Sequence, residues 1–192
     1  MKEPFKKFNQ WWEKALINNP LDQKNAVCIS TIDKHGFPSG RFVDLKSAGE
    51  EGFVFCSYLD SMKGQEIKIN PKIAMTIWWD HVGLQIRAVG KIRELPRSTA
   101  KQLWLSRSRE AQLTTICSKQ SQRLNDKQQL VIQLNDAREQ YKEKVIPKPI
   151  NWGGYIIEPH KIEFLQFKQS RLHTRELFEK KESKWTMHLL QP

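Results

Sequence analysis

The chain has no long apolar run, few cysteines and fewer acidic than basic residues. No stretch of its 192 residues approaches 18 uninterrupted apolar positions, so a transmembrane helix is not expected. The opening residues, MKEPFKK, contain no apolar segment that would act as a signal peptide, so we expect a cytoplasmic protein. The cysteines Cys28, Cys56 and Cys117 form no CxxC pair, which favours free thiols over a disulfide or a metal site.

The common catalytic signatures are missing as well. The sequence contains no P-loop, no GxGxxG, no GxSxG and no kinase motif. Its five histidines show neither HxxxH nor HExxH spacing, so no metal site is expected. These absences exclude the best-known nucleotide-binding and hydrolase classes.

Basic residues are abundant by comparison. Lys plus Arg number 32 and Asp plus Glu number 21, which gives a formal net charge of +11. Apolar residues make up 39% of the chain, enough for a core at this length, so a fully disordered chain is excluded. The charge favours a polyanionic or phosphorylated partner, and nucleic acid is the first candidate.

The hydrophobic pattern predicts strands, then helices, then strands again. An amphipathic helix is expected over residues 5–18, a short one over 61–70, and longer ones over 96–106 and 124–144. Hairpin strands are expected over residues 26–32, 37–45, 52–58, 73–79 and 84–95, and further strands over 154–157, 161–167, 177–181 and 185–190. Strands at hairpin spacing with few crossover helices predict a mainly β (α+β) fold, an antiparallel barrel flanked by helices.

Several cations lie within or just after these strands. Arg41 and Lys46 flank one strand segment, and Lys63 opens the short helix after Ser61. In an extended strand, residues two apart share a face, so the sequence RLHTR over 171–175 would direct two arginines and a histidine at one ligand. Guanidinium and ammonium groups suit phosphate recognition. The pattern therefore favours, weakly, a phosphorylated small molecule as ligand.

Short motifs in a fixed order then point to a family. They are RFVDLK (41–46), GFVF (52–55), SMKG (61–64), Gln85, SRSR (106–109), Gln120-Ser121, WGGY (152–155), IEF (162–164), RLH (171–173) and a terminal Leu-x-Pro. In order and spacing the chain resembles the pyridoxamine 5′-phosphate oxidase family from about residue 5 to its end.

The resemblance implies a fold and an activity. It implies one FMN-binding split-barrel domain over residues 1–192, with an N-terminal helix (1–20), a helical insertion (96–145) and C-terminal strands that complete the barrel (150–192). A homodimer would bind FMN at its interface. The enzyme would oxidise pyridoxamine or pyridoxine 5′-phosphate to pyridoxal 5′-phosphate, passing a hydride to flavin N5, and O₂ would reoxidise the flavin to give hydrogen peroxide.

Site residues follow from the same resemblance. Positions that match cofactor contacts are Arg41, Phe42, Val43, Asp44, Leu45, Lys46, Cys56, Ser57, Lys63, Gln85, Gln120, Ser121 and Arg175. Lys46 and Arg107 match ligands of the substrate phosphate. Arg171 and His173 match the catalytic pair over the substrate ring.

The chain departs from the family pattern at five positions. Met62 replaces a basic residue, Asp44 a leucine and Leu165 a tryptophan beside the flavin. Leu103 and Ala111 replace a tyrosine and a serine that hold the substrate phosphate. These departures keep two alternatives open: a related FMN oxidase with another substrate, of the phenazine-biosynthesis type, and a basic nucleic-acid-binding module.

Overall fold

The computed structural model describes residues 2–17 and 19–192. Contacts between residues divide the chain into two compact units. Unit 1 comprises the chain up to Phe55 together with Glu66–Arg93 and Tyr155–Pro192. Unit 2 comprises Cys56–Gln65 and Glu94–Gly154.

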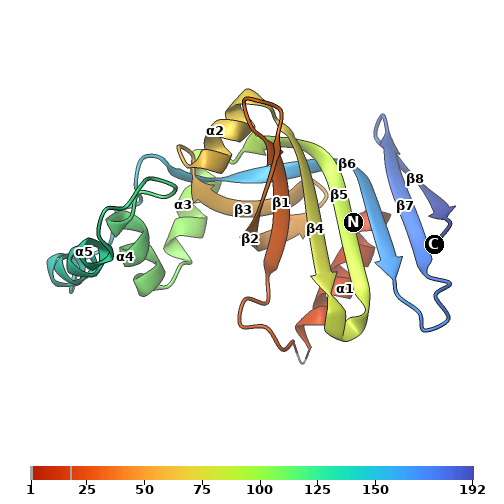
Figure 1. Cartoon of the computed structure of the whole chain (residues 1–192), viewed down its shortest axis with the longest axis horizontal. Helices are drawn as coiled ribbons and strands as arrows, with labels where there is room; N and C mark the ends of the chain where they lie inside the picture. Colours follow the sequence, from red (N-terminus) through yellow and green to blue (C-terminus); the bar gives the residue numbers. More distant parts are fainter. Residues whose placement is uncertain (1, 18) are drawn as a thin grey trace. The chain divides into compact units, whose positions relative to one another are not determined.

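Eight strands and five α-helices form the described chain (Figure 1). The strands are β1 (Ala26–Ile32), β2 (Pro38–Gly49), β3 (Gly52–Tyr58), β4 (Lys72–Trp79), β5 (Leu84–Glu94), β6 (Trp152–Gln166), β7 (Thr174–Lys181) and β8 (Lys184–Leu190). The helices are α1 (Glu3–Leu16), α2 (Met62–Ile69), α3 (Arg97–Leu105), α4 (Arg109–Cys117) and α5 (Lys127–Gln140), with a 3₁₀ turn, η1, at Asp80–Val82.

The strands form one sheet that closes on itself. Their order is β3-β2-β1-β4-β5-β6-β7-β8, and β3 also pairs with β6. That second pairing closes six strands into a barrel, while β7 and β8 extend the sheet beyond β6. The β1–β2, β2–β3, β4–β5, β6–β7 and β7–β8 pairs are all antiparallel. The prediction of an antiparallel barrel flanked by helices is confirmed.

Alternating side chains turn the barrel strands toward a common core. In β1, Val27, Ile29 and Thr31 are buried while their neighbours are partly exposed, and β4 alternates in the same way. Helix α1 packs its buried face on this unit, with the Phe8 ring 4.8 Å from that of Phe53. Such aromatic edge contacts add to the stabilisation from apolar burial.

Two glycines allow β6 to approach its neighbours closely. A Cβ on Gly90 would lie 2.1 Å from the carbonyl oxygen of Glu158, and one on Gly52 would lie 1.9 Å from that of Ile157. Gly52 also has a φ of +136°, which side chains rarely adopt. Glycine is therefore required where the barrel closes.

Unit 2 has its own apolar cluster. Trp104 and Trp152 meet edge to face at 5.0 Å between ring centroids, and Tyr58, Leu113 and Ile146 are buried with them. The indole N–H of Trp104 donates to the Ile146 carbonyl at 3.1 Å, so the buried polar edge of this ring is satisfied.

The observed elements differ from the predicted ones in three places. Helix α4 was not predicted; only Leu113 of its nine residues is buried, so it carries little hydrophobic periodicity. The first two strands expected after residue 150, over 154–157 and 161–167, are one continuous 15-residue strand, β6. Helix α5 starts later than predicted, because Asp126 caps its N-terminus by accepting from the Gln128 N–H, and it already ends at Gln140.

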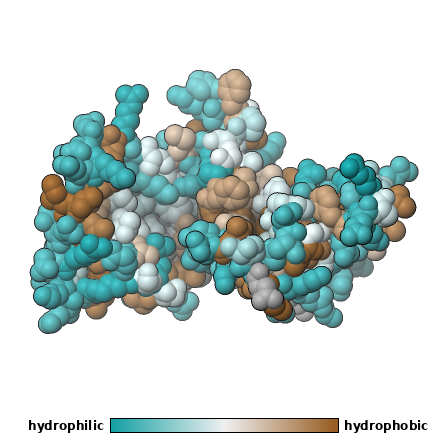
Figure 2. Space-filling view, turned by 60° about the horizontal axis from the view of Figure 1, so that its bottom comes forward, coloured by the Kyte–Doolittle hydropathy of each residue, from teal (hydrophilic) through white to brown (hydrophobic). Residues whose placement is uncertain are grey.

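The face drawn in Figure 2 is mostly hydrophilic, with several apolar groups between the polar residues. Among exposed apolar side chains are Phe42 at 74%, Leu172 at 70% and Leu189 at 72%. Within the described residues, no helix has the length and apolar character needed to cross a bilayer. The three cysteines are free thiols, as predicted.

Candidate active site

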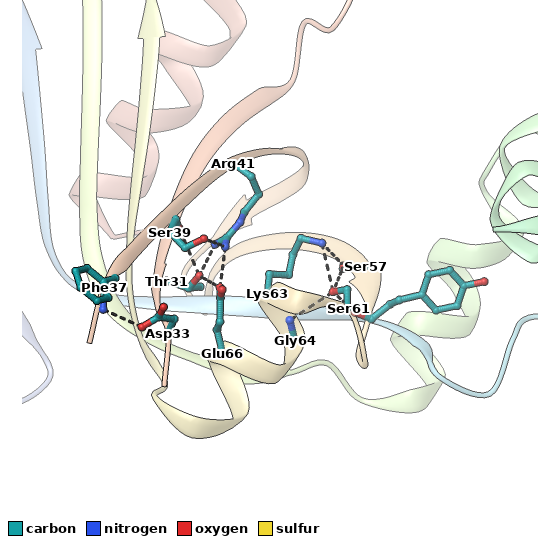
Figure 3. A network of polar contacts seen from close by, with 11 residues as sticks. Thr31, Asp33, Phe37, Ser39, Arg41, Ser57, Ser61, Lys63, Gly64 and Glu66 are labelled. Atoms are coloured by element: carbon teal, nitrogen blue, oxygen red, sulfur yellow. Dashed lines mark hydrogen bonds and ion pairs between the residues drawn. The ribbon is translucent and has the colours of Figure 1, made fainter. Parts of the chain in front are cut away.

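Arg41 lies in a dense polar cluster of unit 1 (Figure 3). Its Nη2 donates to Ser39 Oγ at 2.6 Å and to Glu66 Oε2 at 2.7 Å, and its Nη1 donates to Thr31 Oγ1. The Thr31 hydroxyl in turn donates to Glu66. Thr31 and Glu66 are buried, and only a fifth of the Arg41 side chain is exposed. The guanidinium is therefore fixed in direction and keeps its Nε–H for a further acceptor.

Lys63 lies in a second polar cluster, within unit 2 (Figure 3). Its ammonium donates to Ser57 Oγ at 3.1 Å and to Ser61 Oγ at 3.3 Å. Ser61 also accepts from the Gly64 backbone N–H at the first turn of α2 and donates to the Tyr58 carbonyl. Only 7% of Lys63 is exposed. A cation beside a helix start matches the chemistry that binds a phosphate.

The segment after Arg41 runs along β2 with alternating exposure. Phe42, Asp44 and Lys46 are exposed, Val43 is half-buried and Leu45 is buried. The Lys46 ammonium forms an ion pair with the Asp44 carboxylate. Asp44 is one of the departures from the family pattern, and its charge now offsets that of the neighbouring cation.

Gln85 and Arg175 lie in unit 1, on β5 and β7. Gln85 is half-buried and pairs with Trp78 across the β4–β5 ladder. Arg175 forms a bidentate contact with Glu163, from Nε at 2.9 Å and from Nη2 at 2.8 Å, both to Oε1. Both site residues are held by regular strands.

The Arg171 region corrects one prediction. The segment 171–173 is not extended strand: β7 begins at Thr174, and Arg171 has a φ of +61°. The Arg171 N–H donates to the Lys168 carbonyl at 3.0 Å, and the Arg171 carbonyl accepts from the His173 N–H at 2.9 Å. Arg171, His173 and Arg175 therefore do not share one face of a strand, since the chain turns between them.

His173 is fixed by the same turn. Its Nδ1 accepts from the Lys168 backbone N–H at 3.1 Å. Its ring lies 4.8 Å from that of Phe167, which contacts Trp78 at 4.7 Å. With Nδ1 occupied, the imidazole keeps Nε2 for a ligand. Arg171 itself is exposed.

Arg107 belongs to unit 2 and stacks on two indoles. Its Cζ lies 5.4 Å from the Trp152 ring centroid and 5.9 Å from that of Trp104. Its Nη2 donates to the Ala111 carbonyl at 3.1 Å and to Thr115 Oγ1 at 3.0 Å. Its buried Nε has no hydrogen-bond partner among the described residues. A buried donor left over in this way fits an anionic ligand.

The two departures from the family pattern near Arg107 are apolar residues, and neither makes a polar contact through its side chain. Leu103 is half-buried and packs against the apolar cluster of unit 2. Ala111 uses only its backbone, through the carbonyl that accepts from Arg107. Neither position offers a side-chain hydroxyl.

Cys56 and Ser57 lie near the end of β3, and Ser57 is buried while Cys56 is half-buried. The Ser57 hydroxyl donates to Gln120 Oε1 at 3.2 Å, so unit 2 brings these two predicted residues together. Ser121 is exposed and has a φ of +69°, a backbone conformation uncommon outside glycine.

Tyr58 and Lys148, both in unit 2, have shifted pKa values. Burial raises the pKa of the Tyr58 phenol, whose hydroxyl donates to the Thr115 carbonyl at 2.7 Å. Burial, with a smaller effect of the Arg97 charge, lowers the pKa of Lys148. Its ammonium donates to the carbonyls of Pro149 and Trp152.

Sequence reasoning missed the partners that hold the predicted residues. Thr31, Ser39 and Glu66 fix Arg41, and Glu163 fixes Arg175. Glu163 belongs to the IEF motif, but the motif did not indicate what Glu163 does. Glu66 was harder to identify from the sequence, because its only sign was its position one helical turn after Lys63.

Comparison with known proteins gives the family. Residues 14–141 match the family model described as pyridoxamine 5′-phosphate oxidase. Residues 152–192 match the model described as the pyridoxine 5′-phosphate oxidase C-terminal dimerisation region. The chain is 36% identical to the pyridoxine/pyridoxamine 5′-phosphate oxidase of Synechocystis, over 98% of this chain and 88% of that protein. It is 35% identical to pyridoxine-5′-phosphate oxidase of Bos taurus, over 92% of this chain and 67% of that protein.

Solved structures agree. PhzG of Burkholderia lata, in complex with tetrahydrophenazine-1-carboxylic acid, superposes with a TM-score of 0.93 at 27% identity, covering 100% of this chain and 94% of that one. A pyridoxamine 5′-phosphate oxidase-related, FMN-binding protein of Nostoc punctiforme superposes at 0.75 with 16% identity, covering 95% and 96%, which supports the fold. Two family models together span most of the sequence, so this chain belongs to the pyridoxamine 5′-phosphate oxidase family.

Proposed function

We propose that this chain is an FMN-dependent oxidase that converts pyridoxamine or pyridoxine 5′-phosphate to pyridoxal 5′-phosphate, with O₂ as the final acceptor and hydrogen peroxide as the second product. The observation that carries the proposal is the 36% identity to an oxidase of that name over 98% of this chain. The charge chemistry described above supports it, since the Arg41 guanidinium and the Lys63 ammonium are held in place by hydroxyl oxygens and suit phosphate groups.

The residues fit FMN in the following way. Arg41 and Lys63, each fixed by hydroxyl partners, would bind the FMN phosphate, and Ser121 would extend this set. The ring would lie against the backbone of residues 43–46 and against Cys56 and Ser57. Gln85, Gln120 and Arg175 would contact the flavin. When bound, FMN supplies a two-electron acceptor that O₂ can reoxidise.

The substrate would use a separate set of side chains. Lys46 and the free Nε of Arg107 would bind its phosphate. Arg171 and His173 would lie over its ring and align the C4′ carbon with the flavin. Their contribution is orientation and charge rather than covalent chemistry.

A homodimer is part of the proposal. The dimerisation region over residues 152–192 exposes several large apolar side chains, among them Leu172 and Leu189. A second copy of the chain would cover them, because large exposed apolar residues favour an interface.

A second substrate class is favoured by the apolar positions 103 and 111. Two hydrogen bonds to a phosphate are lost there, at about 1.5–3 kcal/mol each. The similarity to PhzG, a protein solved with a phenazine carboxylic acid, fits an oxidase for a ring without a phosphate.

A peroxide assay on the FMN-loaded protein tests the proposal. Pyridoxamine 5′-phosphate should yield equal amounts of peroxide and pyridoxal 5′-phosphate. Tight FMN binding without turnover of pyridoxamine 5′-phosphate would favour the alternative, an FMN oxidase for a ring without a phosphate. A colourless protein that takes up no FMN and co-elutes with nucleic acid would replace it with the nucleic-acid-binding alternative.

A further inference from the structure

Glu163 is a buried carboxylate on the outward side of the barrel. It lies on β6 between Ile162 and Phe164, whose side chains are fully buried in the core of unit 1. Successive residues of a strand face opposite sides of the sheet, so Glu163 points away from that core. Outward-facing glutamates are normally exposed, yet only 9% of Glu163 is exposed. Something on the outer face must compensate the buried charge.

Two arginines on the neighbouring strands provide that compensation. Arg175 on β7 donates to Glu163 Oε1 from Nε at 2.9 Å, and its Nη2 lies 2.8 Å from the same oxygen. Arg87 on β5 donates to Oε2 at 3.4 Å. The sheet order places β5, β6 and β7 side by side, so the carboxylate bridges three strands (Figure 1).

The far edge of the Arg175 guanidinium is held by the end of the chain. Its Nη1 donates to the Gln191 carbonyl at 3.0 Å. The ladder pairs Arg175 with Leu190 on β8, next to Gln191. Nε and both terminal nitrogens of the guanidinium thus each make one contact. One N–H on each terminal nitrogen is left over.

The cluster adjoins a second expected flavin contact. Gln85 lies two residues before Arg87 on β5, so both face the same side of the strand. Arg175 lies directly opposite Leu165 on β6, two residues after Glu163 on the same face. Both Gln85 and Arg175 were matched to flavin contacts, while Glu163 was not assigned any role.

We propose that Glu163 is a positioning residue for the cofactor: it fixes the guanidinium of Arg175 in the direction needed to donate its remaining N–H groups to the flavin, with Arg87 balancing the second carboxylate oxygen. The inference rests on the proposed function, because it takes Arg175 as a flavin contact. An unsupported arginine adopts many rotamers, and ordering it on binding costs free energy. Because the Glu163 carboxylate orders Arg175 when the protein folds, that free energy is not lost when FMN binds.

A double-mutant cycle in FMN affinity tests the inference. FMN is titrated into the apoprotein, and quenching of flavin fluorescence gives the Kd. Glu163→Gln keeps the shape and removes the charge, and we expect about a tenfold higher Kd, the size of one lost hydrogen bond to a charged group. Arg175→Ala should weaken binding at least as much. In the Arg175→Ala background, Glu163→Gln should add nothing further, because the group it positions is gone.

Glu179→Gln is the matched control. Glu179 pairs with Lys161 across the same two strands, β7 and β6, at 2.8 Å. This variant removes a more exposed cross-strand ion pair of the same two strands and leaves the contacts of Arg175 in place. The FMN Kd should stay within about twofold of the wild-type value.

The outcomes separate the two proposals. Wild-type protein that binds no FMN contradicts the proposed function. If the wild type binds FMN and Arg175→Ala binds it equally well, Arg175 does not contact the flavin, and the inference is wrong. An equal Glu163→Gln effect in both backgrounds would show a merely structural role and overturn the inference. If Glu163→Gln does not fold, Glu163→Asp is used: it keeps the charge but shortens the reach, and unchanged FMN affinity would overturn the inference.

Discussion

Arg41 and Glu66 form a largely buried ion pair that joins β2 to helix α2, with Nη2 2.7 Å from Oε2 (Figure 3). The Thr31 hydroxyl accepts from the arginine and donates to the glutamate, so the three side chains close a small hydrogen-bonded ring. The cation that we propose binds the FMN phosphate is thereby ordered before any ligand binds, which reduces the entropy lost on binding.

Removing the charge of Glu66 should destabilise the protein. Glu66→Gln leaves Arg41 partly buried with a weaker acceptor, so we expect a loss of about 1–3 kcal/mol in the free energy of unfolding. Urea titration of the apoprotein measures it. Glu158→Gln is the control, because Glu158 pairs with Arg93 where both side chains are about half exposed. An equal loss in both variants would contradict a special role for the buried pair.

A second prediction concerns Gly90, where β5 approaches β6 closely. Gly90→Ala places a Cβ 2.1 Å from the Glu158 carbonyl oxygen, so β5 and β6 must separate. We expect the free energy of unfolding to fall by about 2–4 kcal/mol. Gly49→Ala is the matched control, since no atom lies within 4 Å of its new Cβ. Thermal unfolding of both variants checks the prediction, and equal melting temperatures would refute the close approach.

The turn between β1 and β2 should give a pH-dependent stability. The Phe37 N–H, joined by that of His35, donates to Asp33 Oδ1 at 2.8 Å and holds the pKa of this carboxyl below its usual value. A carboxylate whose folded pKa is lowered stabilises the fold above its unfolded pKa, about 4, and loses this effect as the pH falls through the folded value.

The measurement compares the wild type with Asp33→Asn, which keeps the acceptor oxygen and removes the charge. The wild type should melt higher at pH 7, and the difference should vanish as the pH falls below about 4. Asp22→Asn, at an exposed aspartate, serves as control. A difference that persists at pH 2.5 would mean that the charge of Asp33 does not stabilise the turn.

The barrel was predictable from the sequence because its signals are local. Alternating burial in β1 and β4 and turn glycines at Gly36 and Gly83 define the hairpins within a few residues of each other. Helix α4 gave no comparable signal, since one buried leucine in nine residues sets no period. Its formation depends on packing against the rest of unit 2.

The site was predictable as a set of residue types but not as a geometry. Arg171 has a left-handed backbone without glycine, asparagine or aspartate to mark it, so no residue type within 171–173 predicts the turn found there. The partners Glu66 and Glu163 are 25 and 12 residues from the arginines that they hold. Such pairs depend on helix placement and strand register, which no single motif encodes.

The substrate phosphate can be probed at position 111. If Ala111 faces this phosphate, Ala111→Ser restores a hydroxyl, and the KM for pyridoxamine 5′-phosphate should fall about tenfold at unchanged kcat. Ala111→Val, which adds bulk but no donor, is the control and should not lower the KM. Leu103→Tyr is a less direct test, because Leu103 packs against the apolar cluster of unit 2. An unchanged KM in Ala111→Ser would place the phosphate elsewhere.

Arg171 should separate turnover from cofactor binding. It is exposed, it lies in the turn before β7, and its carbonyl accepts from the His173 N–H at 2.9 Å. Arg171→Ala removes a cation proposed to lie over the substrate ring, so kcat should fall by about 10²-fold while FMN binds as before. Stopped-flow reduction of the flavin and flavin absorbance after gel filtration measure the two quantities. Lys168→Ala removes a neighbouring exposed cation from the same turn and should leave both unchanged. Loss of FMN from Arg171→Ala would instead show that this arginine contacts the cofactor and not the substrate.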